Sequence, residues 1–538
     1  MARGLALAAA IAVSLLAVSG AGGAGTQQTP KRGGTVVVPG LFGGGREPAC
    51  LNVWRECGAD DAFDHVSEVL EGAFELEPDR VRPNLVTRVE FTRTPPFTLT
   101  YHIRPEARWS DGTPVSARDF VFTHQVEVAY PGVVPLHKTW IRSVRMVGPK
   151  TVRVVLRSRF AFWRDFFSMI LPEHALRGAK LEEIWTDGID DPRTGRPIGS
   201  GPFLVERFDR GRQLVLRRNP GYWGQHTAYL DRLVIRFGIE DPVEALRTGA
   251  LDVYQVRLGL DPDGARARAR IPGVRQLYAD GIRWEHFEIR GWAPGGHPAL
   301  RNKTIRRALA YGIDRDALVR EVFGEFVPTL RPVESAVFLP ASPHYEPNWR
   351  RYRSRPELAR RLFEQAGCRP GSDGIYECAG ERLSLRFVAG AGVPSRSRAL
   401  DLVQAQLKRV GVEVRPVYVP GRLYGEYIER GEWDLTLISY FYFPHTPVDF
   451  AFRCEGPVNV TGYCQRLVTR ELDQAARTLD PLAYGRALNR ADVQMAQDVP
   501  VIPLWNEPIA VTVRSTLRGF VPSDLLVAWN AENWWLER

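Results

Sequence analysis

Lysine is scarce in this chain of 538 residues. Only six lysines stand beside 65 arginines, and the formal net charge is +9. The arginines are scattered among acidic residues rather than clustered, so we interpret the excess as a compositional bias and expect no nucleic-acid partner. With 44% hydrophobic and 25% charged residues, the chain has the composition of a globular protein. This excludes a disordered, collagen-like or coiled-coil chain.

The motifs of several enzyme classes are missing as well. Beyond the leader there is no G-x-S-x-G, H-E-x-x-H or G-x-x-x-x-G-K-[ST] motif, and the ten histidines show no H-x-H or H-x-x-x-H spacing. Gly390-Ala391-Gly392 lacks the third glycine of a dinucleotide loop, and Pro394 follows it closely. We therefore predict no enzyme, no cofactor and no metal site. A glycosidase with two distant carboxylates stays open, because its acids share no motif.

Long hydrophobic runs are absent except at the start of the chain. Residues 5–18 are almost entirely apolar, a basic Arg3 precedes them, and small residues follow as far as Gly25. The run is too short for a relaxed membrane span and predicts a secretory signal over residues 1–25; an uncleaved anchor is the alternative. No cysteine lies near the cleavage point, so no lipobox is predicted. We expect an exported protein, periplasmic or extracellular, at the cell envelope.

Cysteine is also rare, and its six residues fall into three close pairs. The pairs are Cys50/Cys57, Cys368/Cys378 and Cys454/Cys464. In an exported chain, an even number of locally paired cysteines predicts disulfides. A zinc site is the weaker alternative, because the chain has no C-x-x-C.

Strands predominate from residue 34 to about 240. The alternation of Leu99, Tyr101 and Ile103 predicts a half-buried strand over 97–104. Further strands are predicted over 150–157, 213–217 and 233–237. Ser116 is predicted to cap a helix that includes Asp119.

Helices and strands alternate beyond residue 295. Asn302 and Asp314 are predicted to cap two successive helices, and Ser354 to open a third through a capping box with Glu357. Strands are then predicted over 383–389, 412–419 and 434–440, with helices over 396–410 and 423–429. This βαβαβ run predicts that part of the sheet is parallel.

Several segments, taken together and in this order, resemble the family 5 solute-binding proteins of ABC importers, the peptide/nickel-type group. They are residues 31–36, 47–48, 51–52, 71–72, 99–104, 109–119, 199–203, 218–223 and 306–315. They include W-S-D-G-T-P at 109–114 and R-N-P-G-Y-W at 218–223. Most of these residues form turns or large apolar anchors, so they indicate the family and not the ligand.

The resemblance implies an α/β fold of two lobes, the type II periplasmic-binding-protein fold of the large peptide-binding-like class, with an extra inserted subdomain. Lobe I is mapped to residues 33–46, 196–270 and 500–538, the inserted subdomain to 47–195, and lobe II to 271–499. The implied function is an exported receptor that captures a peptide-like or other small organic solute between the lobes. It would deliver this solute to an ABC permease in the cytoplasmic membrane. An exported hydrolase or a non-transport sensor on the same fold is the alternative, and in either case we expect a monomer.

The expected ligand site departs from the family pattern. In peptide-binding members, an Asp-Pro pair follows a strand near the end of the second lobe, and its carboxylate holds the peptide α-amine. Here Thr446 precedes the proline, so the acid is missing unless Asp449 replaces it. Dipeptide binders also carry an Arg and a Tyr near the positions of Gly390 and Gly392. The two glycines remove a carboxylate clamp and leave space.

Aromatic residues take the place of these charges. Tyr440, Phe441, Tyr442 and Phe443 are consecutive, and alternate side chains of a strand point to opposite sides. One set is therefore predicted to face the cleft and to contact an aromatic, apolar or sugar-like solute. The alternative is that all four pack in the core. His445 is a candidate hydrogen-bonding residue for the solute, although a lone histidine is more often simply hydrogen-bonded within the protein.

A second predicted contact lies on the opposite lobe. Gly58, Asp60 and Asp61 are expected on a cleft loop that a Cys50–Cys57 disulfide closes. The two acids would meet a cationic group of the solute. The alternative is that they are solvated loop residues.

Overall fold

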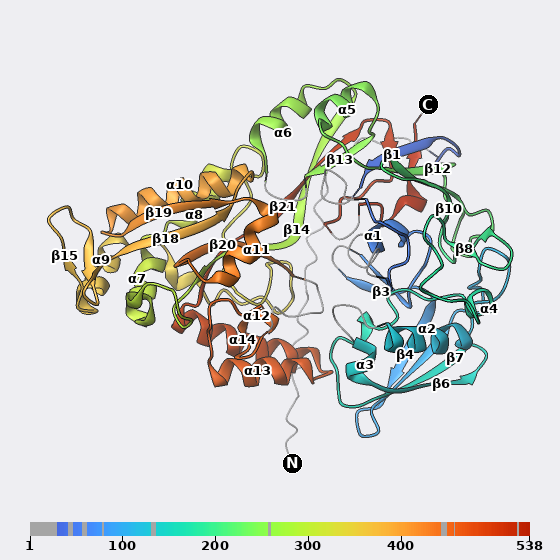
Figure 1. The fold of residues 1–538 in the computed structure, drawn as a ribbon, viewed down its shortest axis with the longest axis horizontal. Coiled ribbons are helices and arrows are strands. Elements are labelled where there is room, and N and C mark those ends of the chain that lie inside the picture. Colours follow the sequence, from blue (N-terminus) through green and yellow to red (C-terminus); the bar gives the residue numbers. More distant parts are fainter. Residues whose placement is uncertain are drawn as a thin grey trace, which may run out of the picture.

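A computed structural model describes residues 29–537 except 41–46, 56–61, 78–79, 131–135, 257–259, 443–448, 457 and 525–526. The chain forms two lobes that lie side by side, and two long strands run between them (Figure 1). We call the part built on two four-stranded sheets lobe I, and the part built on a six-stranded sheet lobe II. No helix of the described part of the chain is long and apolar enough to cross a membrane.

The first sheet of lobe I combines the start of the chain with residues some 200 positions later. Its order is β1 (Thr35–Pro39), β12 (Arg232–Arg236), β11 (Gln213–Arg218) and β10 (Phe203–Asp209). β1 pairs with β12 in parallel, and the other pairs are antiparallel. Both predicted strands of this region, over 213–217 and 233–237, are therefore present.

The second sheet of lobe I is antiparallel throughout. Its order is β4 (Val86–Phe91), β5 (Thr98–Ile103), β7 (Thr151–Leu156) and β6 (Ile141–Gly148). Leu99, Tyr101 and Ile103 of β5 are buried, as their alternation predicts. Helix α2 (Ala117–Ala129) begins with a capping box in which Ser116 and Asp119 bond each other's backbone, which confirms the predicted cap.

The six-stranded sheet forms the centre of lobe II. Its order is β13 (Val253–Val256), β21 (Val501–Arg514), β14 (Val274–Ile289), β20 (Leu435–Phe441), β18 (Ser384–Gly390) and β19 (Glu413–Val419). β18 is parallel to both β19 and β20, so the predicted parallel section is confirmed. Helices α10 (Pro394–Arg409) and α11 (Gly421–Arg430) connect these three strands.

The long strands β14 and β21 join the two lobes. Ile509, Val511 and Val513 of β21 belong to the apolar core of lobe I. The other end of the same strand, with Val501 and Ile502, belongs to the core of lobe II. One strand thus contributes to two separate cores, which is the two-lobed fold that the resemblance implies.

The remaining helices of lobe II lie outside this sheet. They are α7 (Lys303–Gly312), α8 (Arg315–Phe323), α9 (Pro356–Gln365), α12 (Asp449–Phe452), α13 (Arg466–Ala476) and α14 (Pro481–Asp498). Asn302 and Asp314 cap α7 and α8 as predicted. The prediction for α9 is wrong, because its N-cap is Arg355 with no side-chain bond, not Ser354. Pro356 occupies the first helical position, where its fixed φ is favourable, and this sets the helix start.

Two of the predicted disulfides are present as paired. Cys368 bonds to Cys378, and Cys454 bonds to Cys464. Cys50 is buried and also takes part in a disulfide, but its predicted partner Cys57 lies outside the described residues.

Candidate ligand-binding site

The strand order of lobe II contains a topological switch point. From β18 the chain passes through α10 to β19 on one side, and then through α11 to β20 on the other side of β18. In open α/β sheets, ligands bind in the crevice outside the carboxyl ends of the strands at such a point. Here those ends are Gly390 of β18 and Phe441 of β20. The structure therefore brings two predicted site regions, around Gly390 and around residues 440–442, to one edge of the sheet.

The three described aromatic residues at this edge have different surroundings. The Tyr440 hydroxyl donates a hydrogen bond to Glu288 Oε1 at 2.7 Å, and the Tyr440 ring lies 4.8 Å from that of His286. Phe441 has the guanidinium of Arg283 over its ring at 5.3 Å. Burial, followed by the charge of Glu288, raises the pKa of Tyr440 well above its ordinary value.

Tyr442, by contrast, lines a cavity of about 660 Å³ between the two lobes. Lobe I contributes Arg80, Val81, Phe91, Ala161, Phe162, Trp163 and Arg164. The connecting strands contribute Asp280, Gly281, Ile282 and Asn506. Lobe II contributes Phe338, Leu339, Ala341, Ser342, Pro343, His344, Tyr442, Thr478, Leu479, Asp480, Pro481 and Tyr484.

The cavity wall is mainly apolar and includes six aromatic residues. Phe338 meets Tyr442 and Tyr484 edge to face, at centroid distances of 6.3 and 6.2 Å, and Phe162 of lobe I meets Tyr484 at 6.2 Å. Asn506 Oδ1 is buried and has no hydrogen-bond partner among the described residues. A wall of this kind suits an apolar or aromatic group that carries one hydrogen-bond donor.

A group of buried charges lies beside the switch point, and sequence reasoning missed it. Arg396, in the first turn of α10, bonds Glu285 Oε1 at 2.7 Å and Ser439 Oγ at 2.9 Å. Glu507 of β21 is buried as well, and its Oε2 accepts a bond from Trp505 at 2.8 Å. Arg283 pairs with Asp524 at 3.1 Å. The available signal was the presence of charged residues in strands that are otherwise apolar, namely R-W-E-H-F-E at 283–288 and N-E at 506–507.

The glycines predicted at the switch point do leave space. A Cβ at Gly392 would meet nothing within 4 Å, and φ at this residue is +78°. A Cβ at Gly390 would lie 3.6 Å from Arg396 Nη1. Because neither glycine has a side chain, these two positions leave space beside the N-terminus of α10.

The remaining predicted site residues fall outside the described part of the chain. These are Phe443, His445, Thr446, Gly58, Asp60 and Asp61. Asp449 begins α12, but its side chain is not described. Their roles stay predictions.

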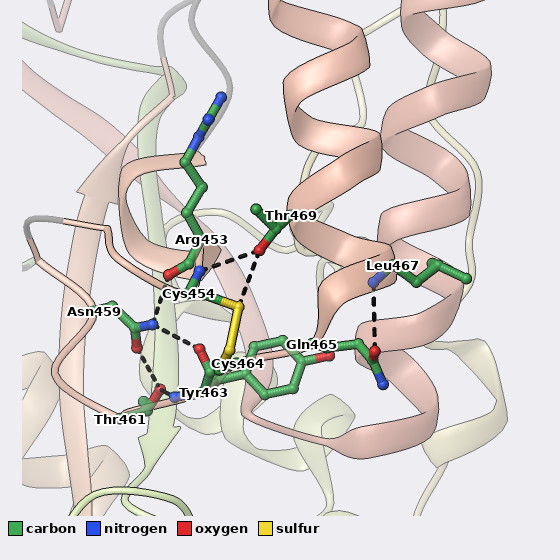
Figure 2. Close-up of a disulfide and its surroundings, with 9 residues drawn as sticks. All are labelled: Arg453, Cys454, Asn459, Thr461, Tyr463, Cys464, Gln465, Leu467 and Thr469. Atoms are coloured by element: carbon green, nitrogen blue, oxygen red, sulfur yellow. Dashed lines mark hydrogen bonds between the residues drawn. A yellow bond between two sulfur atoms is a disulfide. The ribbon is translucent and has the colours of Figure 1, made fainter.

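A loop held by many bonds follows α12. The Cys454–Cys464 disulfide closes it, and Figure 2 shows Asn459 inside, where its Nδ2 donates to the carbonyls of Arg453 and Tyr463 at 2.8 and 2.7 Å. Thr469 of α13 accepts a bond from the Cys454 backbone N–H at 3.1 Å. The loop thereby ties the segment after α12 to α13.

Metal ligation has no support in the described residues, where no three His, Cys, Asp or Glu side chains come together as a metal site would require. The polar groups of the site are instead carboxylates, guanidinium groups and single amide or hydroxyl groups. Such groups recognise organic solutes by hydrogen bonds and charge.

Comparison with known proteins supports a binding role. Residues 80–461 match the family model of bacterial extracellular solute-binding proteins, family 5. The chain belongs to this family. It is a solute-binding receptor of the kind that serves ABC importers, and this finding favours the receptor over the hydrolase or sensor alternative.

Relatives of the family cover most of the chain. Oligopeptide-binding protein OppA of Mycobacterium tuberculosis is 28% identical over 471 residues, which span 85% of this chain and 77% of the relative. A periplasmic EDTA-binding protein, EppA, has a TM-score of 0.82 at 22% identity and covers 95% of this chain and 98% of its own. Oligopeptide-binding protein AppA of Bacillus subtilis, solved with a nonapeptide, has a TM-score of 0.71 at 20% identity over 95% of this chain and 100% of its own. These structures confirm the two-lobed fold.

Proposed function

We propose that this receptor captures a peptide-like or other small organic solute that inserts an apolar or aromatic group into the cavity beside Tyr442. The observation that carries the proposal is the composition of that cavity, because both lobes and both connecting strands supply its wall. A solute that fills it touches both lobes at once. Such a solute stabilises the closed arrangement of the two lobes.

Two of the relatives support a peptide-like solute. One is named for oligopeptides, one was solved with a nonapeptide, and one is named for EDTA. Thr446 provides no charge for an α-amine, so we expect free di- and tripeptides to bind poorly. Calorimetry with free tripeptides tests this expectation, and a sub-micromolar Kd would contradict it.

The biological setting follows from the same proposal. We infer that the chain is exported, that residues 1–25 are removed, and that a monomer delivers its solute to an ABC permease in the cytoplasmic membrane without changing it chemically. We also infer that residues 47–195 form a subdomain inserted into lobe I; β13 and β21, which the sequence-based boundaries assign to lobe I, belong to the six-stranded sheet at the centre of lobe II.

Native mass spectrometry of the purified full chain tests the receptor role. We expect an adduct of one organic molecule per protein, recovered chemically unchanged, and an increase in the melting temperature when the molecule is added back. A turned-over product would contradict the proposal. So would the lack of any adduct together with the lack of a thermal shift across a panel of peptides and aromatic solutes.

The substitution Tyr442→Ala locates the solute. Because it removes a large apolar surface from the cavity wall, we expect binding of the recovered solute to weaken about tenfold or more, which corresponds to roughly 1.4 kcal/mol or more. Tyr376→Ala is the matched control, since Tyr376 is equally buried in lobe II but packs on Phe363 outside the cavity. Equal affinities for the two variants would place the solute elsewhere.

A further inference from the structure

Two buried carboxylates near the switch point have incomplete hydrogen bonding. Glu285 is 1% exposed and Glu507 is 5% exposed. Each has one oxygen in a hydrogen bond, to Arg396 and to Trp505 respectively. The other oxygens, Glu285 Oε2 and Glu507 Oε1, have no partner among the described residues. A buried carboxylate oxygen without a donor carries a large desolvation cost, so it needs an explanation.

The charges of this group do not balance. Arg283 is paired with Asp524, and Arg396 is bonded to Glu285, so no guanidinium of the described residues is bonded to Glu507. Two carboxylates and one guanidinium leave a net charge of about −1 when all are ionised, in a setting where burial strengthens every electrostatic interaction. A single added positive charge would neutralise the group.

The strands bring these two carboxylates together at an irregular point. The pairing of β14 with β21 shifts between Asp280 and Trp284, so residues 281–283 stand opposite Glu507. Glu285 is paired across the strands with Trp505, the residue that bonds Glu507. Bulges of this kind often lie beside functional sites, because they redirect side chains.

Arg396 links the group to the switch point. Gly390 ends β18 at the switch point, and a Cβ at this residue would lie 3.6 Å from Nη1 of the buried Arg396, so no side chain at position 390 packs on that guanidinium. Arg396 in turn bonds Glu285. Asn506, the chain neighbour of Glu507, points to the opposite face of β21, where it lines the 660 Å³ cavity with its own unpartnered Oδ1.

We propose that Glu285 and Glu507 form a subsite for a cationic nitrogen group of the bound solute, an ammonium or a guanidinium. The N–H donors of this group fill Glu285 Oε2 and Glu507 Oε1, and its charge neutralises the cluster through charge-assisted hydrogen bonds. The inference rests on the proposed function and adds the charge of the solute to it.

Paired probes test the subsite without knowledge of the natural solute. Phenylbutylamine and phenylbutanol share an aromatic group and a chain length, but only the amine is cationic at neutral pH. We expect the full-length protein to bind the amine at least about tenfold more tightly than the alcohol by calorimetry at matched ionic strength. Equal affinities for the two probes, or binding of neither, would overturn the subsite.

Two isosteric variants locate the preference. Glu285→Gln and Glu507→Gln should each reduce the amine-to-alcohol ratio to about threefold or less, since each removes the charge that the ammonium needs. Glu71→Gln is the matched control, because Glu71 is an equally buried carboxylate in lobe I whose oxygens already have donors. The Glu71→Gln variant should keep the amine-to-alcohol affinity ratio of the wild-type protein. Retention of the ratio in both site variants would overturn the proposal even if the wild-type protein prefers the amine.

A measurement on the wild-type protein alone gives a second test. Burial, followed by the charge of Glu285, raises the pKa of Glu507 above its ordinary value, while Trp505, Arg396 and Arg283 lower it. Part of Glu507 is therefore protonated near neutral pH, and a bound cation should release this proton. Calorimetry in two buffers of different ionisation enthalpy should show proton release for the amine and none for the alcohol. The lack of release would contradict the contact with Glu507.

The experiments distinguish a failure of the proposed receptor role from a failure of the proposed subsite. If native mass spectrometry recovers a solute that lacks a cationic nitrogen, the receptor role stands and the carboxylate pair is a structural feature. If no solute is recovered but the amine binds with the expected ratio and the two variants lose it, the subsite stands by itself.

Discussion

Buried carboxylates in lobe I and at the connecting strands differ in one respect. Glu71 of lobe I accepts bonds from the Tyr222 hydroxyl at 2.9 Å and from Trp223 Nε1 at 3.0 Å, one to each oxygen. Glu507 is buried to the same degree, but one of its oxygens has no partner in the described chain. Burial raises the pKa of both groups. The comparison teaches that burial and a raised pKa do not distinguish a structural carboxylate from a binding one, whereas the bonding of each oxygen does.

The largest expected effect is a difference in the free energy of unfolding between two variants, each of which removes one of the two carboxylates. Glu71→Ala takes the acceptor from the Tyr222 hydroxyl and should lower the free energy of unfolding by about 2–4 kcal/mol. Glu507→Ala removes the same number of atoms, but it also relieves the repulsion with Glu285, and we expect a loss of about 1 kcal/mol or less. Urea unfolding of both variants measures the difference. Equal losses of unfolding free energy in the two variants would contradict the proposed difference between Glu71 and Glu507.

A smaller effect concerns pH. Burial raises the pKa of Glu71 from 4.5 to about 8, so between these values the folded protein binds more protons than the unfolded chain. The free energy of unfolding should therefore fall as pH rises through this window, by on the order of 1 kcal/mol per pH unit for one group. Burial also raises the pKa of Glu75 to about 7, which acts in the same direction.

The variant Glu71→Gln isolates this contribution, because glutamine does not titrate. Its free energy of unfolding should depend less steeply on pH between about 4.5 and 8 than that of the wild-type protein. Urea titrations at several pH values give the slope. An unchanged slope would show that other groups of the lobe are responsible.

The smallest expected effect comes from a variant in which Glu71, like Glu507, has less complete hydrogen bonding. Tyr222→Phe removes the hydroxyl donor from Glu71 Oε1, so that Glu71 loses a bond of the kind that Glu507 Oε1 lacks. We expect a loss of about 1 kcal/mol in the free energy of unfolding. Because the Tyr222 bond lowers the pKa of Glu71, its removal should also extend the pH-dependent window upward. If the pH range over which stability changes moves to lower pH instead, the proposed effect of the Tyr222 bond on the pKa of Glu71 is wrong.

Much of the fold follows from local patterns along the chain. The alternation in residues 99–103, the caps at Ser116, Asn302 and Asp314, and the βαβαβ run beyond residue 383 all correspond to observed elements. These features depend on residues a few positions apart, which a sequence displays directly. The start of α9 differs from the prediction because two local signals conflict there: Ser354 favours a capping box, whereas Pro356 favours the first helical position and sets the helix start.

The candidate site was predictable only in part. Gly390 ends β18 at the switch point and Tyr442 lines the cavity, and both lie at the carboxyl ends of strands of the parallel section; their roles in ligand binding stay predictions. Glu285, Arg396 and Glu507 were not foreseen, because they come from three segments separated by more than a hundred residues along the chain. Nothing in the local pattern of any one segment indicates that the other two lie beside it.

The sequence by itself therefore determined the elements, their caps, the paired cysteines and the family. The tertiary structure decided which charges meet. The register of β14 against β21, with its shift opposite Glu507, and the position of α10 against β20 place two carboxylates and one guanidinium in a single buried group. That register results from the packing of two cores around shared strands, and such packing is a property of the whole chain rather than of any segment.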